Sequence, residues 1–145
     1  MKTVKDILRS KQGGGGVFSI APDATVFEAL TVMSKKNIGS LLVMENDNLV
    51  GIISERDYSR KVVLVGKSSG NTLVKEIMNQ QVLVIKPDTT IEECMALMIE
   101  NSVRYLPVID ADRVVGVISM GNVVNTIISE QHIVIDNLQK YIMQG

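Results

Sequence analysis

The chain has 145 residues, of which 46% are hydrophobic and 21% charged, and its formal net charge is -1. No run approaches the ~20 consecutive apolar residues of a membrane span, and balanced charge with 3% aromatic content argues against a nucleic-acid-binding surface. The segment from Met1 to Asp6 lacks the apolar core of a signal peptide. We therefore expect a cytoplasmic protein that folds around a core of its own, with no nucleic-acid or membrane partner.

The chain opens with a predicted short helix at Thr3–Leu8, and four glycines follow at Gly13–Gly16. Because glycine loses the most conformational entropy on ordering, a flexible insertion loop is the favoured interpretation. A phosphate-binding loop is the alternative, since glycines expose backbone N–H groups, but the Walker lysine and threonine are absent.

Residues 17–64 predict a β-α-β-β-α unit. An extended run, Val17–Ile20, precedes a helix that Thr25 opens with Glu28 in a capping box. Two apolar strands then flank a four-residue polar turn, which predicts a hairpin, and a second helix follows. The strands are Ser40–Met44 and Leu49–Ser54, the second helix runs from about Arg56 to Leu64, and the apolar stripe of the first helix comprises Val26, Ala29, Leu30 and Met33.

The same unit is repeated 65 positions later, where Val82–Ser129 aligns without a gap with Val17–Leu64. The second copy has its own leading helix, Leu73–Met78, and its own capping box at Thr90 and Glu93. A duplicated unit that cannot bury its apolar face alone packs against its copy, which creates paired clefts related by a pseudo-two-fold axis. Its elements are the extended run Val82–Ile85, a helix with the stripe Ile91, Met95, Met98 and Ile99, the strands Tyr105–Ile109 and Val114–Ser119, and a helix from about Gly121.

Beyond the second copy, Gln131–Met143 predicts an amphipathic helix whose apolar face comprises Val134, Leu138, Tyr141 and Ile142. This face needs a partner surface, either its own domain or a second subunit. His132 falls at the predicted start of this helix, where a solvated or capping role is expected. Cys94 is expected to be a small buried hydrophobe, because a single thiol forms neither an internal disulfide nor a zinc cage.

Two corners carry the candidate chemistry. Each second hairpin strand ends in a serine followed three residues later by an acid or amide, as Ser54 with Asp57 and Ser119 with Asn122. A helix N-terminus and a serine hydroxyl suit a phosphate, and a carboxylate accepts hydrogen bonds from vicinal ribose hydroxyls. Arg56 and Arg104 are candidates for further phosphate pairing. Taken singly, each corner favours plain N-capping over binding.

The pattern as a whole resembles the cystathionine-β-synthase (CBS) domain family, and most closely its stand-alone pairs from bacteria and mitochondria. The residues that carry the resemblance are the Pro-Asp-x-Thr openings, the run Leu49–Tyr58, Ile77 with Met78, Arg104–Asp110 and Val115–Ser119. The resemblance implies an α/β (α+β) fold in which two interlocked β-α-β-β-α units pack as one Bateman-type module. We assign residues 1–66 to CBS motif 1, 67–130 to CBS motif 2 and 131–145 to a C-terminal helix.

The resemblance also implies a homodimer that binds an adenosyl ligand such as AMP, ATP or NAD(H). In the first site, Ser54, Arg56 and Asp57 would hold phosphate and ribose, with the adenine near Asn79–Ile85 and Val103. In the second site, Ser119, Asn122 and Arg104 would take these roles. Its adenine would rest near Phe18, Ile20 and Ile38.

Asn122 stands where the family usually has aspartate. An amide brings no charge, and charge-assisted hydrogen bonds are roughly twice as strong as neutral ones, so weaker ribose binding is expected at the second site.

Two functions remain open. The first is a regulatory module that senses adenine nucleotides and modulates a partner protein, which is not identified by the sequence. The second is a structural adaptor or dimerisation protein with no bound nucleotide. We do not expect an enzyme, a metal site or a catalytic cofactor, because the sequence offers no Cys-His or Ser-His-Asp constellation.

Overall fold

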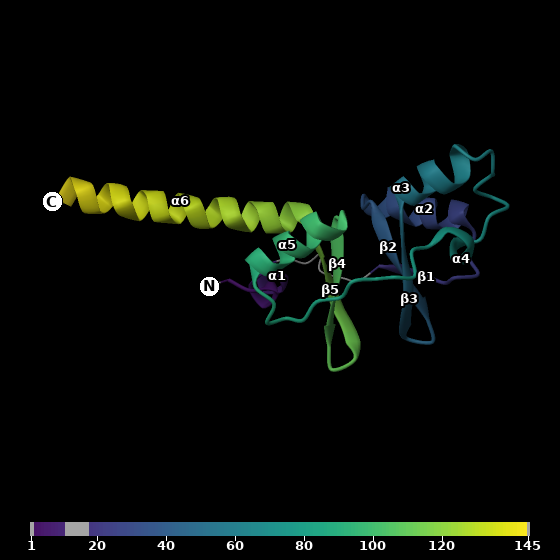
Figure 1. Ribbon diagram of the computed structural model, residues 1–145, viewed down its shortest axis with the longest axis horizontal. Coiled ribbons are helices and arrows are strands. Elements are labelled where there is room, and N and C mark those ends of the chain that lie inside the picture. Colours follow the sequence, from purple (N-terminus) through teal and green to yellow (C-terminus); the bar gives the residue numbers. More distant parts are fainter. Residues whose placement is uncertain (1, 11–17, 145) are drawn as a thin grey trace. The chain divides into compact units, whose positions relative to one another are not determined.

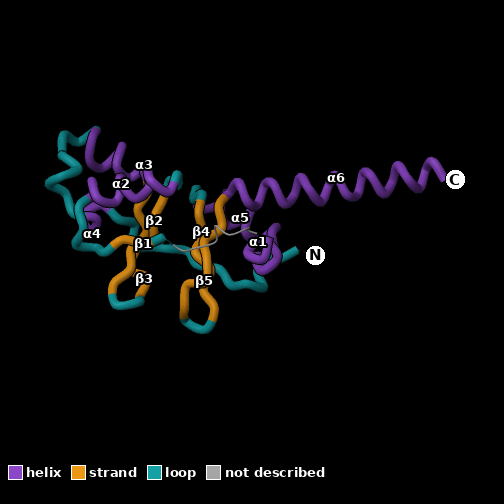
Figure 2. The backbone as a smooth tube through the Cα atoms, turned by 180° about the vertical axis from the view of Figure 1, so that it is seen from behind, coloured by secondary structure: helices purple, strands orange, loops and turns teal. Residues whose placement is uncertain are grey.

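The computed structural model describes residues 2–10 and 18–144, which form two compact units. The first unit comprises residues 18–83 and 111–114, and the second comprises 2–10, 84–110 and 115–144. Figure 1 shows the elements of each unit in sequence colours, and Figure 2 shows the same chain from behind. The predicted Gly13–Gly16 segment lies outside the described residues.

The first unit is a three-stranded sheet with helices. Its strand order is β1-β2-β3, with β1 parallel and β3 antiparallel to β2. The elements are β1 (Ser19–Ile20), α2 (Val26–Lys36), β2 (Ser40–Glu45), β3 (Asn48–Ser54), α3 (Glu55–Tyr58), the π-helical turn η1 (Ser59–Val63) and α4 (Val74–Ile77).

The second unit repeats this plan with a two-stranded sheet. Its elements are α1 (Val4–Ser10), α5 (Ile91–Asn101), β4 (Tyr105–Asp110), β5 (Arg113–Ser119) and α6 (Met120–Gln144). The predicted strand Val82–Ile85 is reduced to a single parallel bridge between Ile85 and Val108. Pro107 explains this loss. In the first copy, the Leu42 N–H donates to the Phe18 carbonyl and so joins β2 to β1. Pro107 occupies the repeat position of Leu42 and has no N–H, so the second copy cannot form the equivalent hydrogen bond.

The two hairpins turn more tightly than predicted. Each has a two-residue turn instead of four residues, because the strands extend to Glu45 and Asn48 and to Asp110 and Arg113. Both central residues of each turn have positive φ, as type I′ turns require. The turn residues are Asn46 and Asp47 in the β2–β3 hairpin and Ala111 and Asp112 in the β4–β5 hairpin.

Each short leading helix packs on the copy that does not follow it directly in the chain. The N–H groups at the start of α1 donate to the Pro-Asp-Thr-Thr turn of the second copy, and those of α4 donate to the Pro-Asp-Ala-Thr turn of the first. These bonds join Val4 to Thr89, Lys5 to Pro87, Val74 to Ala24 and Lys75 to Pro22, at 2.8 to 3.0 Å. The compact units therefore exchange their leading helices relative to the sequence repeats.

Each unit has its own apolar core, and the two cores use equivalent positions. The threonines that open α2 and α5 accept hydrogen bonds from the N–H groups of Glu28 and Glu93, so the threonine half of each predicted capping box is confirmed. Ile99, predicted on the core stripe of α5, is instead exposed, and Cys94 faces the core at the repeat position of Ala29. The paired buried residues are Val26 and Ile91, Met33 and Met98, Leu41 and Leu106, Val43 and Val108, Ile53 and Ile118, and Val74 and Val4.

The helix at the C-terminal end is longer than predicted. The last helix of the second copy and the expected helix at 131–143 form one continuous element, α6, because no glycine or proline interrupts residues 122–144. Residues 131–143 are all exposed, so this half of α6 does not fold back on its own chain. His132 consequently lies in mid-helix and is exposed.

Candidate functional site

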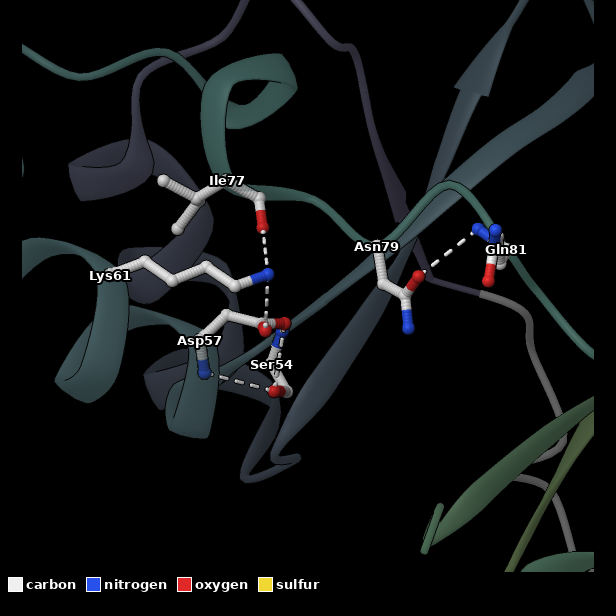
Figure 3. A network of polar contacts seen from close by, with 6 residues as sticks. All are labelled: Ser54, Asp57, Lys61, Ile77, Asn79 and Gln81. Carbon is white, nitrogen blue, oxygen red and sulfur yellow. Dashed lines mark hydrogen bonds and ion pairs between the residues drawn. The ribbon is translucent and has the colours of Figure 1, made fainter. Parts of the chain in front are cut away.

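The first corner lies where β3 gives way to α3. Ser54 Oγ accepts a hydrogen bond from the Asp57 N–H at 3.2 Å, and Asp57 Oδ2 accepts from the Ser54 N–H at 2.9 Å and the Ser54 hydroxyl at 3.0 Å. Both residues thus form the reciprocal capping box that the sequence offers as the simpler interpretation. Figure 3 shows these contacts.

A lysine one turn further along occupies the side of this corner toward α4. Lys61 Nζ lies 3.2 Å from Asp57 Oδ1 and donates to the Ile77 carbonyl oxygen at 2.9 Å (Figure 3). The lysine is half exposed, so this ion pair contributes little to stability. Its main effect is on position, because the Lys61 side chain fills the space between the corner and α4 and holds Asp57 Oδ1 in place.

The second corner, between β5 and α6, repeats the capping geometry with an amide. Asn122 Oδ1 accepts from the Ser119 N–H at 2.9 Å, and Ser119 Oγ accepts from the Asn122 N–H at 3.1 Å. Thr126 stands at the repeat position of Lys61 and donates its hydroxyl to the Asn122 carbonyl oxygen at 2.8 Å. The second corner therefore has neither the carboxylate nor the lysine of the first.

The other predicted residues divide between the units. Phe18, Ile20 and Ile38 pack against the core of the first unit, where the Lys36 ammonium lies 5.2 Å from the Phe18 ring centroid. Asn79 also belongs to the first unit: its backbone pairs with Ile52, and its Oδ1 accepts from the Gln81 N–H at 3.0 Å (Figure 3).

Val103 is half-buried and Arg104 exposed in the second unit, where the Arg104 carbonyl accepts from the Met120 N–H at 2.8 Å. Arg56 is exposed on α3. The structure thus groups the first corner with Asn79, Phe18, Ile20 and Ile38, and the second with Val103 and Arg104. That each site combines residues of both copies stays a prediction.

One feature that the sequence did not reveal is an open pocket of about 360 Å³ within the second unit. It lies between α1 and α6 and is lined by Lys2, Ile7, Ser10, Asn122, Asn125, Thr126 and Ser129. The sequence does contain one signal for this pocket: the long Lys61 of the first copy is replaced by the short Thr126 at the same position of the second. That difference predicts an open space only when it is also known that α1 packs on the second copy.

The single cysteine, Cys94, is unreactive as a nucleophile. Burial raises the pKa of the Cys94 thiol from 9.0 to about 11, with a smaller contribution from the nearby Glu93 and Glu92 carboxylates. The thiol is therefore neutral at physiological pH, and the expected role of a small buried hydrophobe is confirmed. Among residues 2–10 and 18–144, no cluster of three potential metal ligands occurs, and none of the helices has the length and hydropathy of a membrane span.

Comparison with known proteins gives consistent matches along the chain. The sequence model of the CBS domain matches twice, at residues 4–64 and 74–129. The CBS domain-containing protein CBSX3, mitochondrial, of Arabidopsis thaliana is 35% identical over 150 residues, which cover 99% of this chain and 73% of the relative.

Solved structures match equally well. A protein with CBS domains from Burkholderia ambifaria MC40-6 superimposes with a TM-score of 0.86 and is 42% identical, covering 90% of this chain and 96% of its own. The CBS domain pair of protein MJ0100, solved in complex with 5-methylthioadenosine and S-adenosyl-L-methionine, superimposes with a TM-score of 0.76. It is 25% identical and covers 90% of this chain and 98% of its own.

Proposed function

Because the chain belongs to the CBS domain family, we propose that it is a regulatory module that binds adenosine-containing ligands such as AMP, ATP or NAD(H) and catalyses no reaction. The observation that carries the proposal is the doubled serine and acid or amide corner at a helix start. The adenosyl ligands of the MJ0100 pair support the ligand class.

At the first corner, the capping box leaves binding capacity for a ribose. Asp57 Oδ1 has one modest contact, the half-exposed Lys61 ammonium, and a carboxylate oxygen accepts more than one hydrogen bond. The Asp57 carboxylate is thus proposed to accept from ribose hydroxyls, while the exposed Arg56 guanidinium pairs with the phosphate. Asn79, Phe18, Ile20 and Ile38 lie in the same unit as this corner.

At the second corner, the acceptor is weaker. The Asn122 oxygen already accepts the Ser119 N–H, and its amide nitrogen is a donor. The two corners are therefore proposed to differ in affinity, with ribose held better by Asp57 than by Asn122. Ligand at ~100 times its dissociation constant stabilises the bound state by about 2.7 kcal/mol, which suffices to bias an interface with a partner protein.

Exchanging Asp57 for asparagine is expected to weaken one adenine-nucleotide binding event about tenfold without unfolding the protein. The fold survives because asparagine caps the equivalent helix at position 122. Calorimetry of ligand-stripped protein with AMP, ATP and NADH measures the effect. Asp47→Asn, the same charge change in an exposed turn, is the control. An unchanged Asp57→Asn isotherm would remove Asp57 from the site, and no binding to the unaltered protein would refute the proposed function.

A second candidate function, dimerisation through α6, rests on a different observation. Six exposed residues follow each other along α6 at alternating spacings of four and three, as in a coiled-coil seam. Isoleucine fills every a position, and the d positions hold Val124, Gln131 and Leu138, so five of the six seam residues are apolar. The seam comprises Val124, Ile128, Gln131, Ile135, Leu138 and Ile142. In this case α6 joins two copies of the chain, with or without bound nucleotide.

Replacing Leu138 with lysine is expected to weaken self-association at least tenfold, because the charge would enter an apolar seam. Sedimentation equilibrium measures the effect. The fold is unaffected because Leu138 is exposed in the single chain. Gln139→Lys adds the same charge beside the seam and leaves association unchanged. Equal effects of the two substitutions, or an unaltered protein that is monomeric at ~100 μM, would contradict this role.

A further inference from the structure

The pocket between α1 and α6 has a counterpart in the first unit that is filled. There, Lys61 reaches from η1 to the Ile77 carbonyl of α4 and pairs with Asp57. The repeat equivalents of Asp57, Lys61 and Ile77 are Asn122, Thr126 and Ile7, and all three line the pocket. A side chain of four methylenes and an ammonium is thus replaced by a short threonine, which leaves an open space.

The acceptors that hold the lysine in the first unit are occupied in the second. The Ile7 carbonyl accepts from the Ser10 hydroxyl at 2.9 Å, where the equivalent Ile77 carbonyl holds Lys61. The Asn122 side-chain oxygen accepts from Ser119 N–H, and its carbonyl accepts from the Thr126 hydroxyl. The pocket therefore does not offer a cation the acceptors that the first unit offers.

What remains in the pocket is one lysine and several neutral side chains that can donate hydrogen bonds as well as accept them. Asn122 turns its amide nitrogen away from the cap, and Asn125 and Ser129 add an amide and a hydroxyl one and two turns along α6. Lys2 adds a positive charge and is held at the pocket by the Ile91 N–H, which donates to the Lys2 carbonyl at 3.2 Å. No carboxylate occurs among the described residues that line the pocket.

We propose that this pocket binds a phosphate group, with Lys2 supplying the charge and the Asn122, Asn125 and Ser129 side chains supplying hydrogen bonds. A cationic, donor-rich pocket without carboxylates favours an oxyanion over a cation or an apolar ligand. The phosphate belongs either to a nucleotide at the second corner or to free phosphate or pyrophosphate. The inference goes beyond the proposed function, because it needs the phosphate and not the adenosine.

The test is a titration followed by the backbone amide NMR signals of Asn122, Asn125 and Ser129. Pyrophosphate and AMP are expected to shift these signals saturably, whereas adenosine, which brings only the ribose to Asn122, leaves the Asn125 and Ser129 signals unchanged. AMP binding at least tenfold tighter than pyrophosphate identifies a nucleotide as the source, and equal or weaker AMP binding identifies free phosphates. No saturable shift with either probe up to ~10 mM overturns the proposal.

Two variants locate the binding. Lys2→Gln is expected to weaken pyrophosphate binding about tenfold, since one charge-assisted hydrogen bond is lost. Lys5→Gln removes the same charge from an exposed position of α1 outside the pocket and leaves binding unchanged. The double variant Asn122→Asp/Thr126→Lys restores the ion pair of the first unit and is expected to fill the pocket and abolish binding. If the Lys2→Gln variant binds pyrophosphate as tightly as the unaltered protein, the assignment of Lys2 to the phosphate site is wrong.

The same titration separates the two proposals. If AMP shifts signals around Asp57 while neither AMP nor pyrophosphate shifts the pocket signals, the phosphate pocket is refuted and the proposed function stands. If pyrophosphate shifts the pocket signals while no adenosine-containing ligand binds anywhere, the proposed function is refuted and the pocket stands.

Discussion

Val4→Asp is expected to unfold the second unit first, although Val4 precedes the first copy in the chain. Val4 is fully buried on α1, which bonds to the Thr89 and Pro87 carbonyls of the second copy. A buried unpaired carboxylate costs several kcal/mol, so we expect a loss of at least ~4 kcal/mol in that unit. Amide hydrogen exchange then shows lost protection in β4 and β5 before β2 and β3.

Val74→Asp is the mirror experiment. Val74 is equally buried but lies on α4, which bonds to the Ala24 and Pro22 carbonyls of the first copy. Here β2 and β3 are expected to lose protection before β4 and β5. Lys5→Asp, a charge reversal at an exposed neighbour of Val4, leaves both sheets protected. If each substitution instead opened the copy that follows it in sequence, the exchange of leading helices would be wrong.

Gly51→Ala is expected to destabilise the protein by ~2–3 kcal/mol, whereas Gly116→Ala changes stability by less than ~1 kcal/mol. A Cβ at Gly51 would lie 2.7 Å from Met78 Sδ and 3.1 Å from the Asn79 backbone oxygen, and the backbone oxygen is held by its pairing with Ile52. A Cβ at Gly116 would lie 2.5 Å from Leu8 Cδ2 but no closer than 3.8 Å to the other Leu8 atoms. The end of a leucine side chain can rotate away, and alanine restricts the unfolded chain more than glycine does.

Urea unfolding of the two variants measures the difference. Leu8→Ala combined with Gly116→Ala serves as the control, because removal of the contacting methyl groups should make the effect of the new Cβ vanish in the double-mutant cycle. A larger loss at Gly116 than at Gly51 would show that the two equivalent strands are not constrained as described.

The sequence predicts local elements well because their determinants are local. Thr25 and Thr90 cap helices through N–H groups three residues away, and the serines at 54 and 119 do the same. The repeat strengthens each prediction, because the pattern of every helix and strand occurs in both copies. The loss of the strand at Val82–Ile85 depends on Pro107, which is visible in the sequence but becomes meaningful only once its pairing partner is known.

Features that depend on distant segments were not predictable in this way. The pocket arises because α1, at the start of the chain, lies beside α6, at its end. The sequence predicts two helices where the structure has the single helix α6, because a change in hydrophobic pattern near Gln131 does not end a helix. The capping bonds at Ser54 and Ser119 confirm the simpler interpretation of the corners, and their part in ligand binding stays a prediction.

The exchange of leading helices also sets the order in which the two units can fold during synthesis on the ribosome. As the ribosome releases the chain, the first unit has most of its elements once α4 has emerged, within about the first half of the chain. Helix α1 is made well before the turn that receives it, Pro87–Thr90, and before the strands of that copy. During that interval the apolar side chains of Val4 and Ile7, which are buried in the folded protein, have no surface to pack against. A completed second unit of a neighbouring chain can then bind this α1 in a domain swap.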